Sequence, residues 1–213
     1  MENKELLNAL FSRFPELAEL EKNMTEAAEL MINSYSEGGK LLICGNGGSC
    51  SDSDHIVGEL MKGFEKKRPL PAQLANQLTE TGGERGKFLA EKLQQGLPAI
   101  SLTAHNALIT AVANDIGGDF IFAQQVVGYG NPGDVLIGLS TSGNSQNVLD
   151  AIMVAKAKGM KVIGMTGESG GKMKRLCDVL IAVPATRTFC VQELQLPVYH
   201  VLCLMVENYF FTE

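Results

Sequence analysis

The chain has 213 residues, of which 45% are hydrophobic and 20% are charged. That balance supports a sizeable core and excludes global disorder, and the length suits a single domain, expected to span 1–213. The net charge of -6 argues against a nucleic-acid surface. No apolar run approaches the roughly 20 residues that cross a bilayer. We therefore expect neither nucleic acid nor membrane as a partner.

The cysteines indicate the compartment. Five of them are scattered along the chain and form no CxxC pair, which is typical of reduced thiols in a cytosolic protein. The first residues, Met-Glu-Asn-Lys-Glu, lack the apolar core of a signal peptide. A cytoplasmic protein is expected.

In chain order, apolar spacing first predicts an N-terminal helical segment over 1–37, broken at Pro15. A short strand, Leu41–Cys44, and a helix over 50–64 follow. Further strands are predicted at 98–102, 135–139, 161–165 and 179–183, and further helices at 105–113, 119–127, 146–158, 170–176 and 191–210. This alternation predicts an α/β fold: a three-layer sandwich around a five-stranded parallel sheet, flavodoxin-like in arrangement.

Residues 65–97 interrupt the rhythm and are interpreted as an insertion. They are polar, contain Gly82-Gly83, and are long for a connection between a helix and a strand. Residues 84–95 have the apolar spacing of an amphipathic helix. A lid or a surface arm is one interpretation, and a mobile loop is the other.

The strand at 135–139 runs directly into Ser-Thr-Ser-Gly-Asn-Ser at 140–145, and a helical pattern follows. Free backbone N–H groups and the positive end of a helix dipole suit a phosphate there. The side chains of Ser140, Thr141, Ser142 and Ser145 add donors. The turn predicts a phosphorylated ligand, with an ordinary N-cap turn as the alternative.

A second turn, Gly45-Asn-Gly-Gly-Ser49, also joins a strand to a helix. It is not the dinucleotide fingerprint, because Cys50 stands where glycine is needed, and no Walker A sequence follows. Its glycines allow close backbone approach to a ligand. Both turns follow strand carboxyl ends, where open α/β sheets bind ligands, although a plain tight turn remains the alternative here.

Two pairs of side chains have helical spacing. His55 and Glu59 are four residues apart and share a helix face, so they could bind a divalent metal, or Glu59 could act as a base. Gln192 and His200 share a face of the final helix. The alternatives are solvated side chains for the first pair and a core histidine for the second.

Asn114-Asp115 lies between an apolar segment and Ile116-Gly-Gly118. The pair fits a turn or an N-cap. Asp115 could instead accept hydrogen bonds from sugar hydroxyls.

Together these motifs resemble the phosphoheptose isomerase branch of the sugar-isomerase (SIS) domain family, over roughly 40–64 and 98–208. The resemblance implies an aldose–ketose isomerase that interconverts sedoheptulose 7-phosphate and a manno-heptose 7-phosphate, working as a homotetramer with sites between subunits. It implies that Glu59 is the base and His200 the acid. It implies a zinc ion held by His55, Glu59, Gln192 and His200. The sugar phosphate would be bound by Asn46, Gly47, Gly48, Ser49, Asn114, Asp115, Ser140, Thr141, Ser142, Ser145 and Gln192.

Three features depart from that family: the long 65–97 segment, Gly63 where an arginine is expected, and Thr188–Val191 without the usual charged residues. Alternative interpretations are an isomerase for a pentose or hexose phosphate, a sugar-phosphate sensor, and a non-catalytic SIS protein of the kind that associates with a replication initiator. Glu59 and His200 favour catalysis over the last of these.

Overall fold

A computed structural model describes residues 3–211, so the outermost residues of the predicted 1–213 domain and 1–37 segment lie outside it. Five parallel strands form one sheet in the order β2-β1-β3-β4-β5. The strands are β1 Leu41–Gly45, β2 Ala99–Ser101, β3 Val135–Leu139, β4 Lys161–Gly167 and β5 Val179–Val183. This is the flavodoxin-like order, so the predicted α/β fold is confirmed.

Side chains of the central strands point alternately to the two faces of the sheet, so the core is divided into two apolar clusters. Leu41 and Ile43 of β1 face one apolar cluster, and Leu42 and Cys44 face the other. All four side chains are completely buried. The near-continuous apolar strands follow from this burial on both faces.

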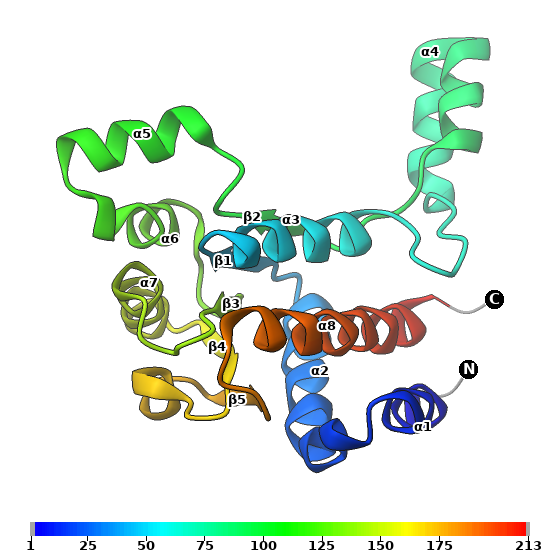
Figure 1. The fold of residues 1–213 in the computed structure, drawn as a ribbon. Coiled ribbons are helices and arrows are strands. Elements are labelled where there is room, and N and C mark those ends of the chain that lie inside the picture. The colour runs from blue at the N-terminus through cyan, green and yellow to red at the C-terminus, as the bar shows by residue number, and fades with distance from the viewer. Residues whose placement is uncertain (1–2, 212–213) are drawn as a thin grey trace.

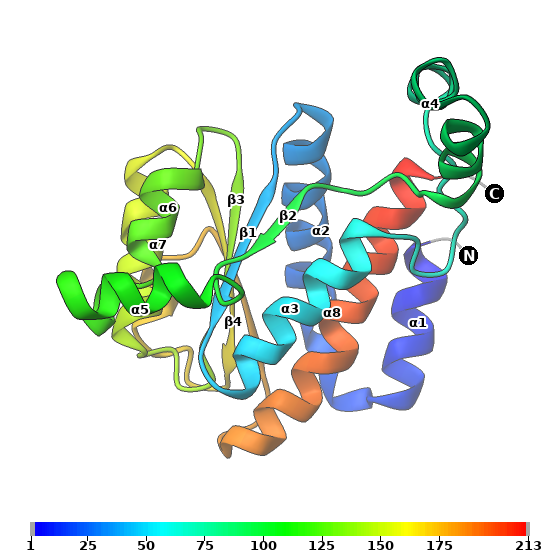
Figure 2. The same ribbon diagram turned by 90° about the horizontal axis from the view of Figure 1, so that it is seen from above.

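Helices cover both faces of the sheet, which gives the predicted three layers (Figures 1 and 2). One face carries α1 Asn3–Arg13, α2 Glu21–Ser36, α3 Gly48–Met61 and α8 Thr188–Phe210. The other carries α6 Ala123–Tyr129 and α7 Gln146–Ala157. The remaining helix before α6, α5 Asn106–Asp115, stands away from the body in both views.

Several predicted boundaries need correction. Pro15 does separate two helices, but it opens a short 3-10 helix, Pro15–Leu20. The helix expected at 119–127 divides into a 3-10 turn, Gly118–Phe120, and α6. The helix expected at 170–176 is a 3-10 helix, Gly171–Arg175, because its start is held by two glycines at positive φ.

The 65–97 segment forms a helical arm rather than a loop. Its helix, α4 Ala72–Lys92, begins well before the predicted residue 84 and projects from the body in Figure 1. The chain kinks at Gly83, which has a φ of 53° that favours glycine. Beyond the kink Gly86 is buried, with no room for a Cβ beside the Leu78 carbonyl. The two halves of the arm therefore pack on each other, which the polar composition concealed.

Among residues 3–211, one helix is long and apolar enough to cross a membrane by length and composition, and it is α8. It packs against α1, α2 and α3 and supplies core residues such as Val198 and Leu202. Its apolar character is therefore that of a core helix.

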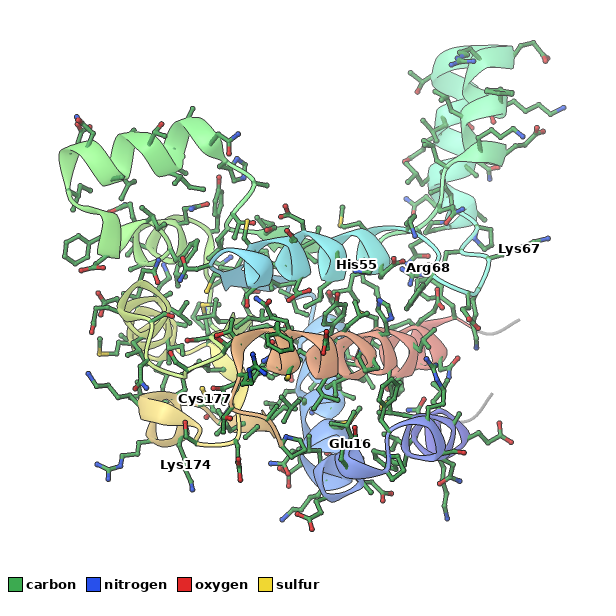
Figure 3. The ribbon with its side chains drawn as sticks, in the orientation of Figure 1. Glu16, His55, Lys67, Arg68, Lys174 and Cys177 are labelled. Atoms are coloured by element: carbon green, nitrogen blue, oxygen red, sulfur yellow. The ribbon has the colours of Figure 1, made fainter. Side chains whose placement is uncertain are left out.

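A buried ion pair attaches the root of the arm to α8, and Figure 3 labels its Arg68 where the arm leaves the body. The Arg68 and Glu207 side chains are 0% and 1% exposed, and Nη2 of Arg68 lies 2.8 Å from Oε1 of Glu207. Arg68 also donates to the Leu60 carbonyl at 2.6 Å, at the end of α3. Glu207 accepts backbone N–H bonds from Phe64 and Glu65. One ion pair thus fixes the end of α3, the following loop and α8 together.

Burial alone would raise the pKa of Glu207, but the backbone donors of Glu65 and Phe64 and the Arg68 guanidinium hold that pKa below its ordinary value of 4.5. A carboxylate with a lowered folded-state pKa stabilises the protein above its unfolded-state pKa. That contribution is lost as the pH falls through the folded-state value.

We predict that Glu207→Gln lowers the free energy of unfolding by about 3–5 kcal/mol at pH 7, because it leaves Arg68 buried without its counter-ion. The difference from wild type should shrink as the pH falls from the unfolded-state pKa, about 4.5, through the lower folded-state pKa of Glu207, because Glu207 is then protonated in wild type as well. Urea titrations across this range measure both effects.

Glu26→Gln is the matched control, since Glu26 forms an exposed pair with Lys22. It should change stability by at most about 1 kcal/mol. A pH-independent difference for Glu207→Gln would contradict the account.

Candidate functional site

The two ligand turns open side by side at the point where the strand order reverses. β1 and β3 are neighbours in the sheet, and their following helices, α3 and α7, cover opposite faces. Nδ2 of Asn46 donates to Oδ1 of Asn147, and Nδ2 of Asn147 donates back to Oδ1 of Asn46, both at 2.9 Å. This reciprocal amide pair joins the turn after β1 to the start of α7. It lies at the switch point where such sheets bind ligands.

The 140–145 turn is held rigidly. The Ser140 and Ser145 hydroxyls are hydrogen-bonded at 2.9 Å. Gly143 has a φ of 66°, and a Cβ there would lie 2.4 Å from the Gly170 carbonyl oxygen. The Met173 N–H donates to the Gly143 carbonyl at 3.2 Å. Because neighbouring backbone fixes the turn, its donors need little reorganisation to bind an anion.

The predicted phosphate-binding side chains differ in access. Ser142 is exposed, and Thr141 and Ser145 are partly exposed. Ser140 and Ser49 are each 3% exposed. Ser49 packs closely against Gly45 beneath its turn, so the structure gives it a packing role.

Three positions of the other turn are open to solvent. Asn46, Gly47 and Gly48 are exposed at the start of α3. Gly47 has a φ of 58°, which explains why glycine stands there. This turn and the serine turn together form the anion cradle, defined as residues 46–48 and 140–145.

Further along α3, His55 contacts Glu59 and the final helix. Nε2 of His55 lies 3.2 Å from Oε1 of Glu59, and Nζ of Lys62 lies 2.9 Å from Oε2 of the same carboxylate. The His55 and His200 rings meet edge to face, 4.9 Å between centroids. The predicted acid–base residues Glu59 and His200 are therefore neighbours within one chain, on either side of His55.

His200 carries an unpaired buried nitrogen. Its Nε2 is buried without a hydrogen-bond partner among the described residues. Burial and the neighbouring His55 lower the pKa of His200, and Glu59 opposes the shift. The imidazole is therefore neutral near pH 7, and an unpartnered nitrogen of this kind points to a ligand.

Tyr199 and Asp52 extend this cluster. The Tyr199 hydroxyl lies 3.0 Å from Nδ1 of His55 and donates to Oδ1 of Asp52 at 3.2 Å. Burial raises the pKa of Tyr199, and Asp52 raises it further, so the phenol stays protonated. Burial also raises the pKa of Asp52, against opposing effects of Tyr199 and His55.

Gln192 lies with the anion cradle rather than with the histidines. A Cβ on Gly48 would lie 2.4 Å from its Nε2, so the amide rests directly on the start of α3. Gly48 precedes His55 by seven residues, or about 10 Å along a helix. The structure therefore brings Gln192 to the predicted substrate site but not to the other three predicted metal ligands.

Asn114 and Asp115 are not brought to the cradle. They are the last two residues of α5, where Nδ2 of Asn114 donates to Oδ1 of Asp115 at 2.8 Å. Both are exposed, and the helix projects away from the body (Figure 2). The expected turn or N-cap is instead a helix end.

The predicted zinc ligands form a cluster without forming a metal cage. Within residues 3–211, no three histidine, cysteine, aspartate or glutamate side chains converge closely enough to hold an ion. Glu59 is occupied by its contacts with His55 and Lys62. The donor set of two imidazoles, a carboxylate and an amide still fits zinc chemistry.

A cavity of about 360 Å³ lies between α1, α8 and the loop at residues 64–65, and His200 forms part of its wall. Most of its lining is apolar, including Leu10, Phe14 and Leu204. Such a lining does not suit a sugar phosphate, so this cavity is not assigned as the substrate site.

Sequence reasoning missed four residues that shape the site: Asp52, Tyr199, Arg68 and Asn147. Asp52 and Tyr199 do carry a signal, since each lies on the helix face of a predicted site residue. Arg68 and Asn147 carry none, because their partners are 139 and 101 residues away in the chain.

Comparison with known proteins identifies the class. The family model described as the SIS domain matches residues 7–92 and 85–167. The phosphoheptose isomerase of Rhodospirillum rubrum is 42% identical over 195 residues, covering 92% of this chain and 90% of that protein. The phosphoheptose isomerase of Helicobacter pylori is 40% identical, covering 91% of this chain and 88% of that protein.

Two solved structures that resemble this chain belong to the same class of protein. A phosphoheptose isomerase from Francisella tularensis superimposes with a TM-score of 0.76 at 31% identity, covering 98% of this chain and all of that one. The Neisseria gonorrhoeae phosphoheptose isomerase gives a TM-score of 0.71 at 34% identity, covering 93% and 94%. The chain belongs to the SIS-domain family, in its phosphoheptose isomerase branch.

We predict that Asn147→Asp weakens the binding of inorganic phosphate about tenfold or more, because it places a carboxylate beside the anion cradle. Asn76→Asp, on the distant arm, adds the same charge as a control and should leave binding unchanged. Titration calorimetry with phosphate at fixed ionic strength measures both. Unchanged phosphate affinity in Asn147→Asp would place the anion site elsewhere.

Proposed function

We propose that this chain interconverts sedoheptulose 7-phosphate and D-glycero-manno-heptose 7-phosphate through an enediol, with Glu59 as base and His200 as acid. Membership of the phosphoheptose isomerase branch makes it an aldose–ketose isomerase. The contact of both Glu59 and His200 with His55, beside a rigid anion cradle, is the observation that carries the residue assignment. It also favours catalysis over a non-catalytic binding protein.

The anion cradle would bind the sugar's phosphate through its hydroxyls and the first N–H groups of α7. Anchoring the phosphate restricts the reacting carbons and lowers the entropic cost of orienting them. Gln192, lying on Gly48, would contact the sugar at the side of the cradle nearer the histidines.

Proton transfer needs a base at carbon and a group that serves the two oxygens. Nζ of Lys62 holds Oε2 of Glu59, and the carboxylate lies on the same face of α3 as His55, so it is fixed in position to take the carbon-bound proton. His200 is neutral because burial lowers its pKa. A neutral imidazole has one donor and one acceptor nitrogen, so it can give a proton to one oxygen and receive one from the other.

A zinc ion at His55, Glu59, Gln192 and His200 is part of the proposal. The buried, unpartnered Nε2 of His200 and the nitrogen and oxygen character of the set support it. A bound zinc ion would polarise the sugar carbonyl. Gln192 lies apart from the other three ligands, so its coordination would require movement or a contribution from a second subunit.

A homotetramer with sites between subunits is proposed for the same reason. Asn114 and Asp115 project on α5 away from their own cradle, so a role in substrate binding requires a neighbouring subunit. Ile116 and Phe120, next to them, are exposed apolar side chains suited to such a contact. The free cysteines support a cytoplasmic location.

We predict that Glu59→Gln lowers kcat by about 10²–10⁴-fold, because it removes the positioned base. The affinity for sedoheptulose 7-phosphate should stay within a few-fold of wild type, since the cradle is untouched. Interconversion is followed by NMR. Glu29→Gln, an exposed carboxylate on α2, is the control. Near-wild-type turnover in Glu59→Gln would exclude this base.

Removal of metal by a chelator should lower kcat at least tenfold, and returning zinc should restore it. His200→Ala should retain less zinc after dialysis, while His105→Ala, at an exposed position, should retain as much as wild type. Full activity in protein shown to be metal-free would contradict the zinc assignment.

A further inference from the structure

His55 lies between two acceptors that compete for its ring proton. Its Nδ1 is 3.0 Å from the Tyr199 hydroxyl, and its Nε2 is 3.2 Å from Oε1 of Glu59. A neutral imidazole carries one proton, which can sit on either nitrogen. A proton on Nε2 would bond Glu59 and remove the lone pair that faces the site. A proton on Nδ1 would keep that lone pair available.

The single hydroxyl proton of Tyr199 decides which of these two tautomers His55 adopts. The phenol has one proton, and it donates that proton to Oδ1 of Asp52 at 3.2 Å. Its oxygen can then only accept from His55, so Nδ1 of His55 is the donor. The hydrogen bonds therefore run in one direction, from His55 to Tyr199 to Asp52.

The surroundings keep this chain of hydrogen bonds in place. Tyr199 is 1% exposed on α8, so water cannot readily replace it. Asp52 is held one turn before His55 on α3. Since the three groups come from two packed helices, their geometry is set by the core and not by mobile loops.

We propose that Tyr199, backed by Asp52, is a positioning residue that keeps the proton of His55 on Nδ1 and leaves Nε2 free to act in the site. The use of that lone pair in catalysis rests on the proposed function; the protonation state does not. Partners of this kind, which orient a ligating histidine through its second nitrogen, commonly change activity or metal affinity 10–100-fold when removed.

The test uses Tyr199→Phe, which removes the hydroxyl and keeps the ring. The chain has 3 histidines, so the ring nitrogens can be observed individually by NMR after ¹⁵N-histidine labelling. Spectra are recorded on metal-free protein as the pH is raised until the rings are neutral. Wild type should show His55 protonated at Nδ1. In Tyr199→Phe the proton should move to Nε2, where Glu59 accepts it, and kcat should fall about 10–100-fold.

Tyr35→Phe is the matched control, because the Tyr35 hydroxyl is also buried but has no partner among the described residues. It should leave the His55 spectrum and kcat unchanged. His105, which is exposed, serves as an internal reference.

A wild-type His55 protonated at Nε2, or a Tyr199→Phe variant that keeps the proton on Nδ1, would overturn the proposal. If the proton moves as expected but wild type does not isomerise the sugar phosphate, the positioning role stands and the proposed function fails. The two failures are therefore distinguishable.

Discussion

The packing of α3 on α8 is the constraint on which the candidate site depends. The two helices run side by side in the same direction (Figure 2). At their starts Gly48 lies against Gln192, and in the middle His55 lies against Tyr199 and His200. At the far end, Arg68 joins the last turn of α3 to Glu207. Each turn of α3 therefore meets one particular turn of α8. The pairing places the proposed anion-binding turn and the proposed proton-transfer residues along one continuous contact between the two helices.

The sheet fixes where that seam begins. Reversal of strand order at β1 brings the turns after β1 and β3 together, and the Asn46–Asn147 amide pair joins them. At the other end, the Arg68–Glu207 ion pair joins α3, the root of the arm and α8. Taking two charges out of water is costly, and the pair is tolerated because both groups have several hydrogen-bond partners. Nη2 of Arg68 also donates to the Glu59 carbonyl at 3.2 Å, so the ion pair also stabilises the backbone that carries the proposed base.

The sequence predicted the sheet, both ligand turns and the pairing of His55 with Glu59, because each depends on local pattern. Apolar runs of four to five residues identify buried strands, and helical spacing places side chains on a common face. A surface arm was one of the two interpretations of 65–97, but the extent of its helix was underestimated, because its polar residues conceal two halves that pack on each other at Gly86. The Asp52–Tyr199 chain and the Arg68–Glu207 pair depend on contacts between distant segments, which periodicity does not encode.

The same distinction applies to the site residues. The contact between the His55 and His200 rings agrees with the grouping expected from the sequence, whereas Gln192 lies by Gly48 and Asn114 lies on a projecting helix. A single chain thus assembles the proposed proton-transfer residues and the anion cradle, but it leaves Gln192 away from the histidines and Asn114 away from the cradle. This is the physical reason for proposing that neighbouring subunits complete the site.

The most direct measurement is a crystal structure of the purified protein with sedoheptulose 7-phosphate bound. We expect the phosphate on the 140–145 turn, and carbons 1 and 2 of the sugar beside Glu59 and His200, with reacting atoms within about 3 Å of those side chains or one water away. A phosphate bound outside the anion cradle, or a sugar whose reacting carbons lie beyond reach of Glu59 in the assembled protein, would contradict it.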